Sequence, residues 1–282
     1  MFRYFWQNKR TIVVVIGAII LTTLGVRATD NITSTFLASV GENVERNELL
    51  CPLDMVFVPS ETGGFCIDKY EASPGSGCSY QDPQSQVQTR TNLNEINCKP
   101  VSVSLAVPWR YISQDQAQAA CAKAGKRLPT NEEWYLAALG TPDVNSNWGP
   151  EDCHVANNWN SQPGLTGSGS KCISSAGAYD MVGNVWEWVK GTALDGVYEE
   201  KRQLPERGYI DSTDGRGLPG LTNPNTPNPN YNEDYFWVHS EGLRAFARGG
   251  YWDNQSLAGI YSIYLIYQPS SVGPGTGFRC AK

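Results

Sequence analysis

Eight cysteines spread along the chain are the feature that most constrains its fold. No two of them form a CxxC pair, which argues against zinc-ribbon and thioredoxin-like sites. An even number of cysteines in a chain with an export signal is typical of a disulfide framework, and the alternative is eight free thiols in a cytosolic protein. The cysteines are Cys51, Cys66, Cys78, Cys98, Cys121, Cys153, Cys172 and Cys280. We therefore expect four disulfides.

The N-terminal segment supplies the export signal. Arg3, Lys9 and Arg10 precede an uncharged apolar run of sixteen residues, 11–26. A membrane span usually takes about 20 residues. Residues 1–28 are therefore either a membrane anchor, extended by a snorkelling arginine, or a cleaved signal peptide. In both cases the positive charge lies on the N-terminal side, so we expect the remainder to be extracytoplasmic.

The rest of the chain divides into a short connecting segment and one domain. Residues 29–50 carry apolar side chains four positions apart, the pattern of one narrow helical stripe, and form either a stalk helix or a partly ordered linker. The domain covers residues 51–282. Its many Gly and Pro residues predict a loop-rich fold. Capping-box spacings predict helices that begin at Ser113 and Thr130, and residues 179–189 read as a dense apolar strand.

Three long segments are loop-like in composition: residues 73–100, residues 141–178 and a Pro- and Asn-rich insertion at 190–246. Loops of this length are usually functional or disordered. Loop closure favours three disulfides between cysteines that are close in sequence: Cys51–Cys66, Cys78–Cys98 and Cys153–Cys172.

Charge and histidine content exclude several classes of function. The net charge is -6 and no basic run follows the first ten residues, so we expect no nucleic-acid partner. The only histidines are His154 and His239, which excludes a histidine-rich metal site. The chain has no Gly-rich phosphate loop and no HExxH motif.

Four segments resemble, in order, the hallmark segments of the formylglycine-generating enzyme (sulfatase-modifying factor) family. They are AGKRLPTNEEW (124–134), YDMVGNVWEWV (179–189), ARGGYW (247–252) and GFRCA (277–281). The resemblance implies an α+β domain with an irregular C-type-lectin-like, formylglycine-generating-enzyme-like fold that is loop-rich and disulfide-stapled. It also implies a disulfide between Cys121 and Cys280, which would contribute about 4 kcal/mol in the chain-entropy model.

The same resemblance bears on catalysis. The family's oxidases need two cysteines after the Arg-Gly-Gly segment, because soft thiolates bind copper. Asp253 and Ala258 hold those positions here, and neither can replace a thiolate. The related iron enzymes need a histidine cluster that this chain lacks. We therefore expect no copper and no enzymatic activity, with a divergent oxidase as the minor alternative.

Calcium is a candidate structural cofactor by resemblance. The positions that match one calcium site of the family are Asp180, Gly183, Val185 and Glu187. Two carboxylates and two carbonyls are suitable hard oxygen ligands. The alternative is that both carboxylates make only local hydrogen bonds. For the family's other calcium site, Asn157 and Asn158 are the only hints.

Residues 248–282 also resemble the variable region of target proteins of diversity-generating retroelements. Such proteins vary at positions encoded by adenine-rich Asn codons, and AAC can mutate to codons for Tyr, Asp, Leu, Ile, Ser or Gly. The matching positions are Tyr251, Asp253, Leu257, Tyr264, Ile266, Tyr267, Ser271, Gly273 and Gly275, with Asn254 as an unmutated one. The resemblance implies that these ten residues form a ligand-binding surface.

The residues alone do not decide whether these positions lie on the surface or in the core. Tyrosine gives a large amphipathic contact area at low entropic cost, as in antibody paratopes. However, both faces of the run IYSIYLIY (260–267) are apolar, so its alternation fits a core strand equally well. We expect a surface-displayed protein that binds an unknown protein or surface ligand and contacts the membrane through its N-terminus. The alternative is a structural or adhesive envelope domain with a fixed partner.

Overall fold

The computed structural model describes residues 51–144, 146–199 and 201–282. The predicted anchor or signal peptide, 1–28, and the predicted stalk, 29–50, lie outside the described residues. Within the described part of the chain, none of the helices combines the length and the apolar character that crossing a membrane requires.

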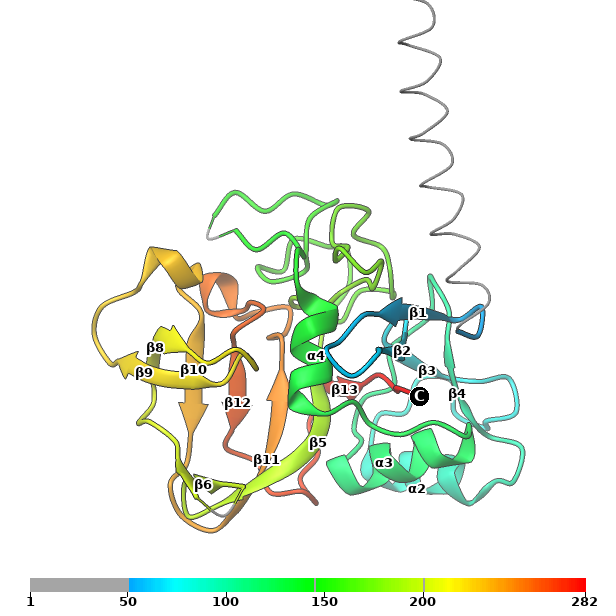
Figure 1. Cartoon of the computed structure of the whole chain (residues 1–282). Coiled ribbons are helices and arrows are strands. Elements are labelled where there is room, and N and C mark those ends of the chain that lie inside the picture. The colour runs from blue at the N-terminus through cyan, green and yellow to red at the C-terminus, as the bar shows by residue number, and fades with distance from the viewer. Residues whose placement is uncertain (1–50, 145, 200) are drawn as a thin grey trace, which may run out of the picture. The chain divides into compact units, whose positions relative to one another are not determined.

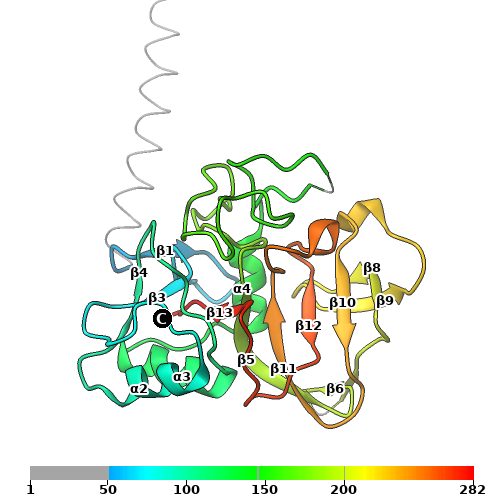
Figure 2. The same cartoon turned by 180° about the vertical axis from the view of Figure 1, so that it is seen from behind.

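One nine-stranded sheet organises the domain. Its strands are β5 (Trp186–Leu194), β6 (Val197–Tyr198), β7 (Arg202–Gln203), β8 (Gly208–Thr213), β9 (Pro219–Asn223), β10 (Tyr235–Val238), β11 (Leu243–Arg248), β12 (Ile263–Leu265) and β13 (Thr276–Phe278). They lie in the order β7-β6-β5-β11-β12-β10-β8-β9, and β13 pairs with β5. Figure 2 shows β5, β11, β12 and β10 side by side. The C-terminal segment is therefore built into the centre of the sheet.

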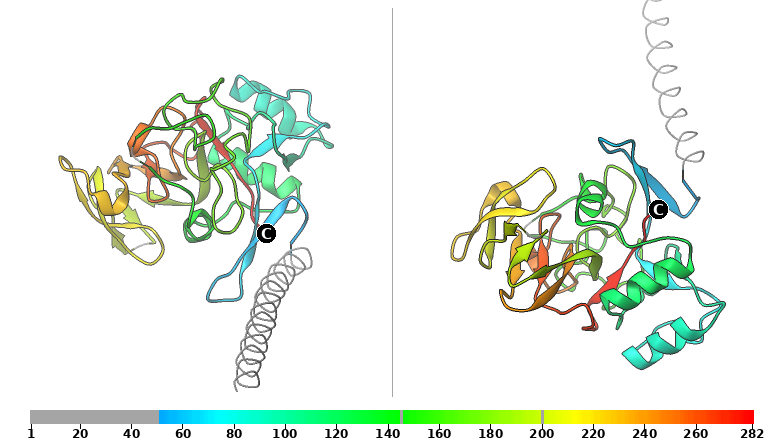
Figure 3. Two further views of the ribbon diagram at one scale, coloured as in Figure 1. Left: turned by 90° about the horizontal axis from the view of Figure 1, so that it is seen from above. Right: turned by 60° about the horizontal axis from the view of Figure 1, so that its bottom comes forward.

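The remaining elements flank this sheet. The two small sheets pair β1 (Met55–Val58) with β2 (Phe65–Asp68) and β3 (Ala72–Pro74) with β4 (Pro100–Ser102). The helices are α2 (Gln86–Asn94), α3 (Gln114–Lys123), α4 (Asn131–Ala138) and the 3-10 turns η1 (Pro229–Tyr231) and η2 (Gln255–Leu257). Figure 1 places α4 in front of β5, and Figure 3 shows α2 and α3 lying together at one side of the domain.

The two predicted capping boxes are confirmed. Ser113 accepts a hydrogen bond from Gln116 N at the start of α3, and Thr130 accepts one from Glu133 N at the start of α4. The Gln116 and Glu133 side chains complete both boxes by accepting from the N-cap amides. These helix starts could be predicted from the sequence because a capping box depends only on residues three apart.

Three predictions about local structure were wrong. Residues 73–100 are not only loop, because they contain α2. The predicted strand over 179–189 begins only at Trp186, because Asp180 and Asn184 have positive φ and cannot continue a strand. The insertion 190–246 is not an unstructured loop, since it carries β6 to β10 and so extends the sheet.

The four hallmark segments meet in the core, where they hold the fold together. Glu187 accepts from the Trp134 indole nitrogen at 2.7 Å and from the Arg279 guanidinium at 2.6 and 2.7 Å. Arg248 lies over the Trp134 ring at 5.1 Å. All four side chains are buried. Removing one partner of such a buried pair is expected to destabilise the protein by about 3–5 kcal/mol.

Four disulfides staple the loops to this core. The structure contains the four expected pairs, Cys51–Cys66, Cys78–Cys98, Cys121–Cys280 and Cys153–Cys172. The third joins α3 to the residues after β13 across 159 positions of sequence. The predicted class, an α+β, loop-rich and disulfide-stapled domain, is confirmed.

Candidate functional site

The burial pattern of strand β12 distinguishes surface positions from core positions, which the alternation of apolar residues in the sequence could not do. Ile263 and Leu265 are fully buried, whereas Tyr264 between them is half-buried. The expected variable residue therefore faces the surface, and its neighbours fill the core.

The other expected variable positions share this accessibility. Asp253 is exposed, and Gly273 is the only buried position of the ten. The partly exposed ones are Tyr251, Asn254, Leu257, Tyr264, Ile266, Tyr267, Ser271 and Gly275. Two of the ten positions are glycines without a side chain, and none of the eight side chains at the others is fully buried.

A cavity of about 280 Å³ gathers six of these positions. Its lining comprises the expected residues Tyr251, Asn254, Tyr264, Tyr267, Gly273 and Gly275, together with Trp186, Trp237, Pro274 and Thr276. The expected residues come from β12 and from the loops before and after it. The fold brings together residues up to 24 positions apart, because the loops on both sides of the short strand β12 meet at the cavity.

Aromatic rings form the walls of this cavity, which we call the aromatic cavity. Trp186 and Trp237 stand at 86° to each other with ring centroids 5.4 Å apart. Tyr264 packs against Trp186 at 5.4 Å and against Tyr267 at 5.0 Å. Burial raises the pKa of Tyr264 and of Tyr251, so their hydroxyls stay protonated at neutral pH.

Trp237 is a site residue that the sequence did not indicate. It lies on β10 in the insertion and reaches the site because β10 pairs in parallel with β12, with Trp237 opposite Tyr264. On the neighbouring strand pair, Tyr235 lies opposite Tyr209. The rings of Tyr235 and Trp237 are 4.8 Å apart, so a row of aromatic side chains continues from the cavity across β10 to β8.

Glycine keeps the cavity open. A Cβ atom added at Gly273 would meet Thr276 Oγ1 at 3.5 Å and the Tyr267 ring at 3.8 Å, which are ordinary contacts. Gly249 and Gly250 differ because both have positive φ, and a Cβ at Gly250 would lie 2.3 Å from Ala258 Cβ. Gly273 therefore has room for a side-chain atom, whereas Gly249 and Gly250 are fixed by the scaffold, and a Cβ atom at Gly275 would lie 2.9 Å from the Tyr251 ring.

Four expected positions lie outside the cavity lining and make local contacts. Asp253 Oδ1 accepts from Asn157 Nδ2 at 2.7 Å. The other contacts are Ser262 Oγ to the Leu257 carbonyl (2.6 Å), Arg244 Nη1 to the Ile266 carbonyl (3.0 Å) and Gln268 N to Ser271 Oγ (3.1 Å). Two of these three use backbone carbonyls, so the side chains of Leu257 and Ile266 can change without breaking them.

Some atoms of the residues expected to bind calcium already have partners within the protein. Both oxygens of Glu187 are held by the Arg279 guanidinium, which already supplies the compensating positive charge. Asp180 Oδ2 accepts from Gly167 N, and Oδ1 is buried without a hydrogen-bond partner. Burial raises the pKa of Asp180 to about 7.

The other two residues of that set provide only backbone atoms, and Val185 N donates to the buried carboxylate of Glu71. The hinted second site is also occupied by local contacts. Asn158 Oδ1 accepts from Val155 N and Ala156 N, and its amide nitrogen donates to two carbonyls.

The positions that match the family's copper ligands carry no metal-binding chemistry of that kind. Ala258 is buried, and Asp253 is exposed. All eight cysteines are in disulfides, so no thiolate is available. Within 51–144, 146–199 and 201–282, no group of three or more His, Cys, Asp or Glu side chains is placed to hold a metal.

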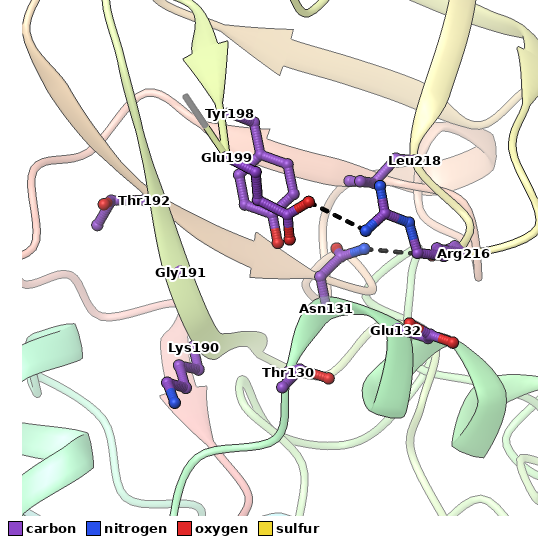
Figure 4. Close-up of a pocket in the computed structure, with 10 residues that line it drawn as sticks. All are labelled: Thr130, Asn131, Glu132, Lys190, Gly191, Thr192, Tyr198, Glu199, Arg216 and Leu218. Atoms are coloured by element: carbon purple, nitrogen blue, oxygen red, sulfur yellow. Dashed lines mark hydrogen bonds and ion pairs between the residues drawn. The ribbon is translucent and has the colours of Figure 1, made fainter. Parts of the chain in front are cut away.

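A larger cavity of about 410 Å³ lies between α4, β5 and the insertion (Figure 4). Its lining is Thr130, Asn131, Glu132, Lys190, Gly191, Thr192, Tyr198, Glu199, Arg216 and Leu218. Arg216 pairs with Glu199 at 3.1 Å, and its carbonyl accepts from Asn131 Nδ2. No expected variable position lines it, and the sequence analysis did not identify it.

Comparison with known proteins relates this domain to a protein family and to individual relatives. The chain matches the family model of the sulfatase-modifying factor enzyme 1-like domain over residues 41–282. Over 127 residues it is 33% identical to an inactive C-alpha-formylglycine-generating enzyme 2 of Bos taurus, covering 39% of this chain and 41% of that protein. Over 97 residues it is 34% identical to a formylglycine-generating enzyme of Mus musculus, covering 29% of this chain and 26% of that one.

The match therefore spans less than half the length of these curated relatives. Among solved structures, Treponema denticola variable protein 1 aligns with 82% of this chain and 99% of its own at 16% identity and a TM-score of 0.41. A relative that is named inactive and one that is named as the enzyme match at 33% and 34% identity, so overall similarity does not decide whether this chain is a catalyst. The residues at the site must decide it.

Proposed function

This chain belongs to the sulfatase-modifying factor enzyme 1-like family, and from that premise we propose that it is a non-catalytic protein that binds a ligand through a diversified C-terminal surface. One observation carries the proposal. Six of the ten positions expected to vary line one cavity, while Ile263 and Leu265, which alternate with one of them, fill the core. A surface on which residues change without altering the fold needs this separation.

The chemistry of the site supports a binding role over catalysis. The two positions that match the copper ligands hold an exposed aspartate and a buried alanine, and the hallmark side chains are engaged in the core network. The aromatic cavity offers rings and hydroxyls, which suit recognition rather than electron transfer.

The location follows from the cysteines. Four disulfides form and persist in an oxidising compartment, so the domain is extracytoplasmic. Display on the cell surface through the N-terminal segment belongs to the proposal, because a diversified binder must meet its ligand outside the cell.

A displayed library tests the proposal directly. The ten expected positions would be randomised together, and a matched library would randomise ten buried positions of the same domain. We expect most members of the first library to reach the display surface folded and to yield binders to a model protein such as lysozyme, whereas the second library is lost to misfolding. Equal loss of both libraries would contradict the proposal.

The flanking DNA gives an independent test of diversification. We expect a near-copy of the last ~100 bases that differs only at adenines, next to a reverse-transcriptase gene. Its absence from the source genome would favour a structural or adhesive domain with a fixed partner.

A further inference from the structure

The aromatic cavity has a shape and a charge that point to a ligand class. We propose that it receives a positively charged side chain, the ammonium of a lysine or the guanidinium of an arginine, from a protein ligand. The inference rests on the proposed function, because it names the chemistry that the same surface recognises.

The first argument is the arrangement of the rings. Five aromatic side chains line the cavity: Trp186, Trp237, Tyr251, Tyr264 and Tyr267. The face of an aromatic ring carries the negative part of its quadrupole and attracts a cation that reaches it. A compact cation gains from each of them, most from tryptophan.

The second argument is charge. None of the described residues that line the cavity carries a charge. Asp253 follows Tyr251 by two positions, its carboxylate is exposed, and only its Oδ1 is engaged by Asn157. A cation at the cavity therefore finds a carboxylate nearby and no resident cation to repel it.

Two arginines contact residues that neighbour the cavity, and both already have partners within the protein. Arg110 pairs with Asp82 at 3.0 Å, and Arg244 donates to the carbonyls of Glu241 and Ile266. The whole chain is also acidic, with a net charge of -6. The net negative charge of the chain favours association with a basic partner.

The third argument concerns the size of the partner. The aromatic row continues beyond the cavity through Tyr235 to Tyr209, and both rings are partly exposed. A free small cation would leave that row without a contact, whereas a protein that inserts one basic side chain can cover it. Aromatic residues that bury a charged side chain from the partner are typical hot spots of protein interfaces.

The experiment compares two probes that differ only in the charged group. N-acetyl-lysine-N-methylamide and N-acetyl-norleucine-N-methylamide would be titrated into the disulfide-intact domain, with binding followed by tryptophan fluorescence and NMR. A desolvated cation–π contact is worth about 1–2 kcal/mol, so we expect the lysine probe to bind roughly 5- to 30-fold more tightly. Trp237→Leu should remove this preference, and Tyr209→Leu, at the far end of the row, should retain it.

A second variant covers the case in which Trp237→Leu fails to fold. Gly273→Val fills the cavity from a position with room for a Cβ atom, and we expect it to exclude the lysine probe. Equal binding of both probes, a preference that survives both cavity variants, or binding of tetramethylammonium without the lysine probe would each overturn the inference. None of these results would affect the library experiment, so failure of the cation and failure of the proposed function remain distinguishable.

Discussion

Two Gly→Ala substitutions in one short segment should have opposite consequences, and they separate scaffold from binding surface. At Gly250, φ is +94° and an added Cβ would lie 2.3 Å from the Cβ and 2.8 Å from the Cα of Ala258. The left-handed conformation costs a non-glycine residue about 1–2 kcal/mol, and overpacking adds about 1–3 kcal/mol. We expect Gly250→Ala to lower the free energy of unfolding by about 2–5 kcal/mol in total.

At Gly273 neither the conformational cost nor the overpacking cost applies. Its φ lies outside the left-handed region, and its nearest neighbours would be 3.5 Å or more from the added atom. We expect Gly273→Ala to change stability by no more than about 0.5–1 kcal/mol, with a gain if the unfolded chain loses entropy.

Thermal unfolding under non-reducing conditions measures both variants. For a domain of this size each kcal/mol shifts Tm by about 2–4 °C, so Gly250→Ala should lose roughly 4–20 °C while Gly273→Ala stays close to the parent. A Tm loss at Gly273→Ala as large as that at Gly250→Ala would refute the division of these glycines into scaffold and surface.

Three further predictions follow from the fold. Removing the Cys121–Cys280 disulfide should lower stability by about 4–5 kcal/mol in the chain-entropy model, and peptide mapping that joined Cys280 to another partner would overturn the fold alignment. Burial raises the pKa of Asp143 to about 7, so the folded state binds this proton more tightly than the unfolded chain. Stability should therefore fall as pH rises from about 4 to 7, and Asp143→Asn should reduce that slope in Tm measured against pH, because the neighbouring Asp234 and other buried carboxyls also contribute to it. The domain should show no copper-dependent oxidation of cysteine-containing peptides, and such turnover would contradict the non-catalytic assignment.

The features that could be predicted from sequence are those encoded locally or by a family motif. The capping boxes at Ser113 and Thr130 depend on residues three apart, and three of the disulfides close short loops. The fourth came from the family resemblance, because nothing local connects Cys121 with Cys280. The cavity positions were likewise named by resemblance, and the alternation of apolar residues in 260–267 could not distinguish the core from the surface.

The features that were missed depend on contacts between distant segments. Helix α2 has no apolar stripe, and Asn92 ties it to Tyr80 through both the amide and the carbonyl of that residue. Trp237 enters the site only because β10 adds in parallel to β12. The sequence also did not show that Glu187 pairs with Arg279, which lies 92 positions further along the chain.

The most direct test of the central claim compares surface and core substitutions around the same strand. The first variant replaces Leu257, Tyr264 and Tyr267 by Ser, and the second replaces only Ile263 and Leu265 by Ser. Truncating a buried Leu or Ile costs about 2–5 kcal/mol, so the second variant should lose much of the about 5–15 kcal/mol that a domain has and fail to fold. We predict that the first variant retains a cooperative melt within a few degrees of the parent Tm. Collapse of that melt would show that these residues form the hydrophobic core and that the binding surface has been misplaced.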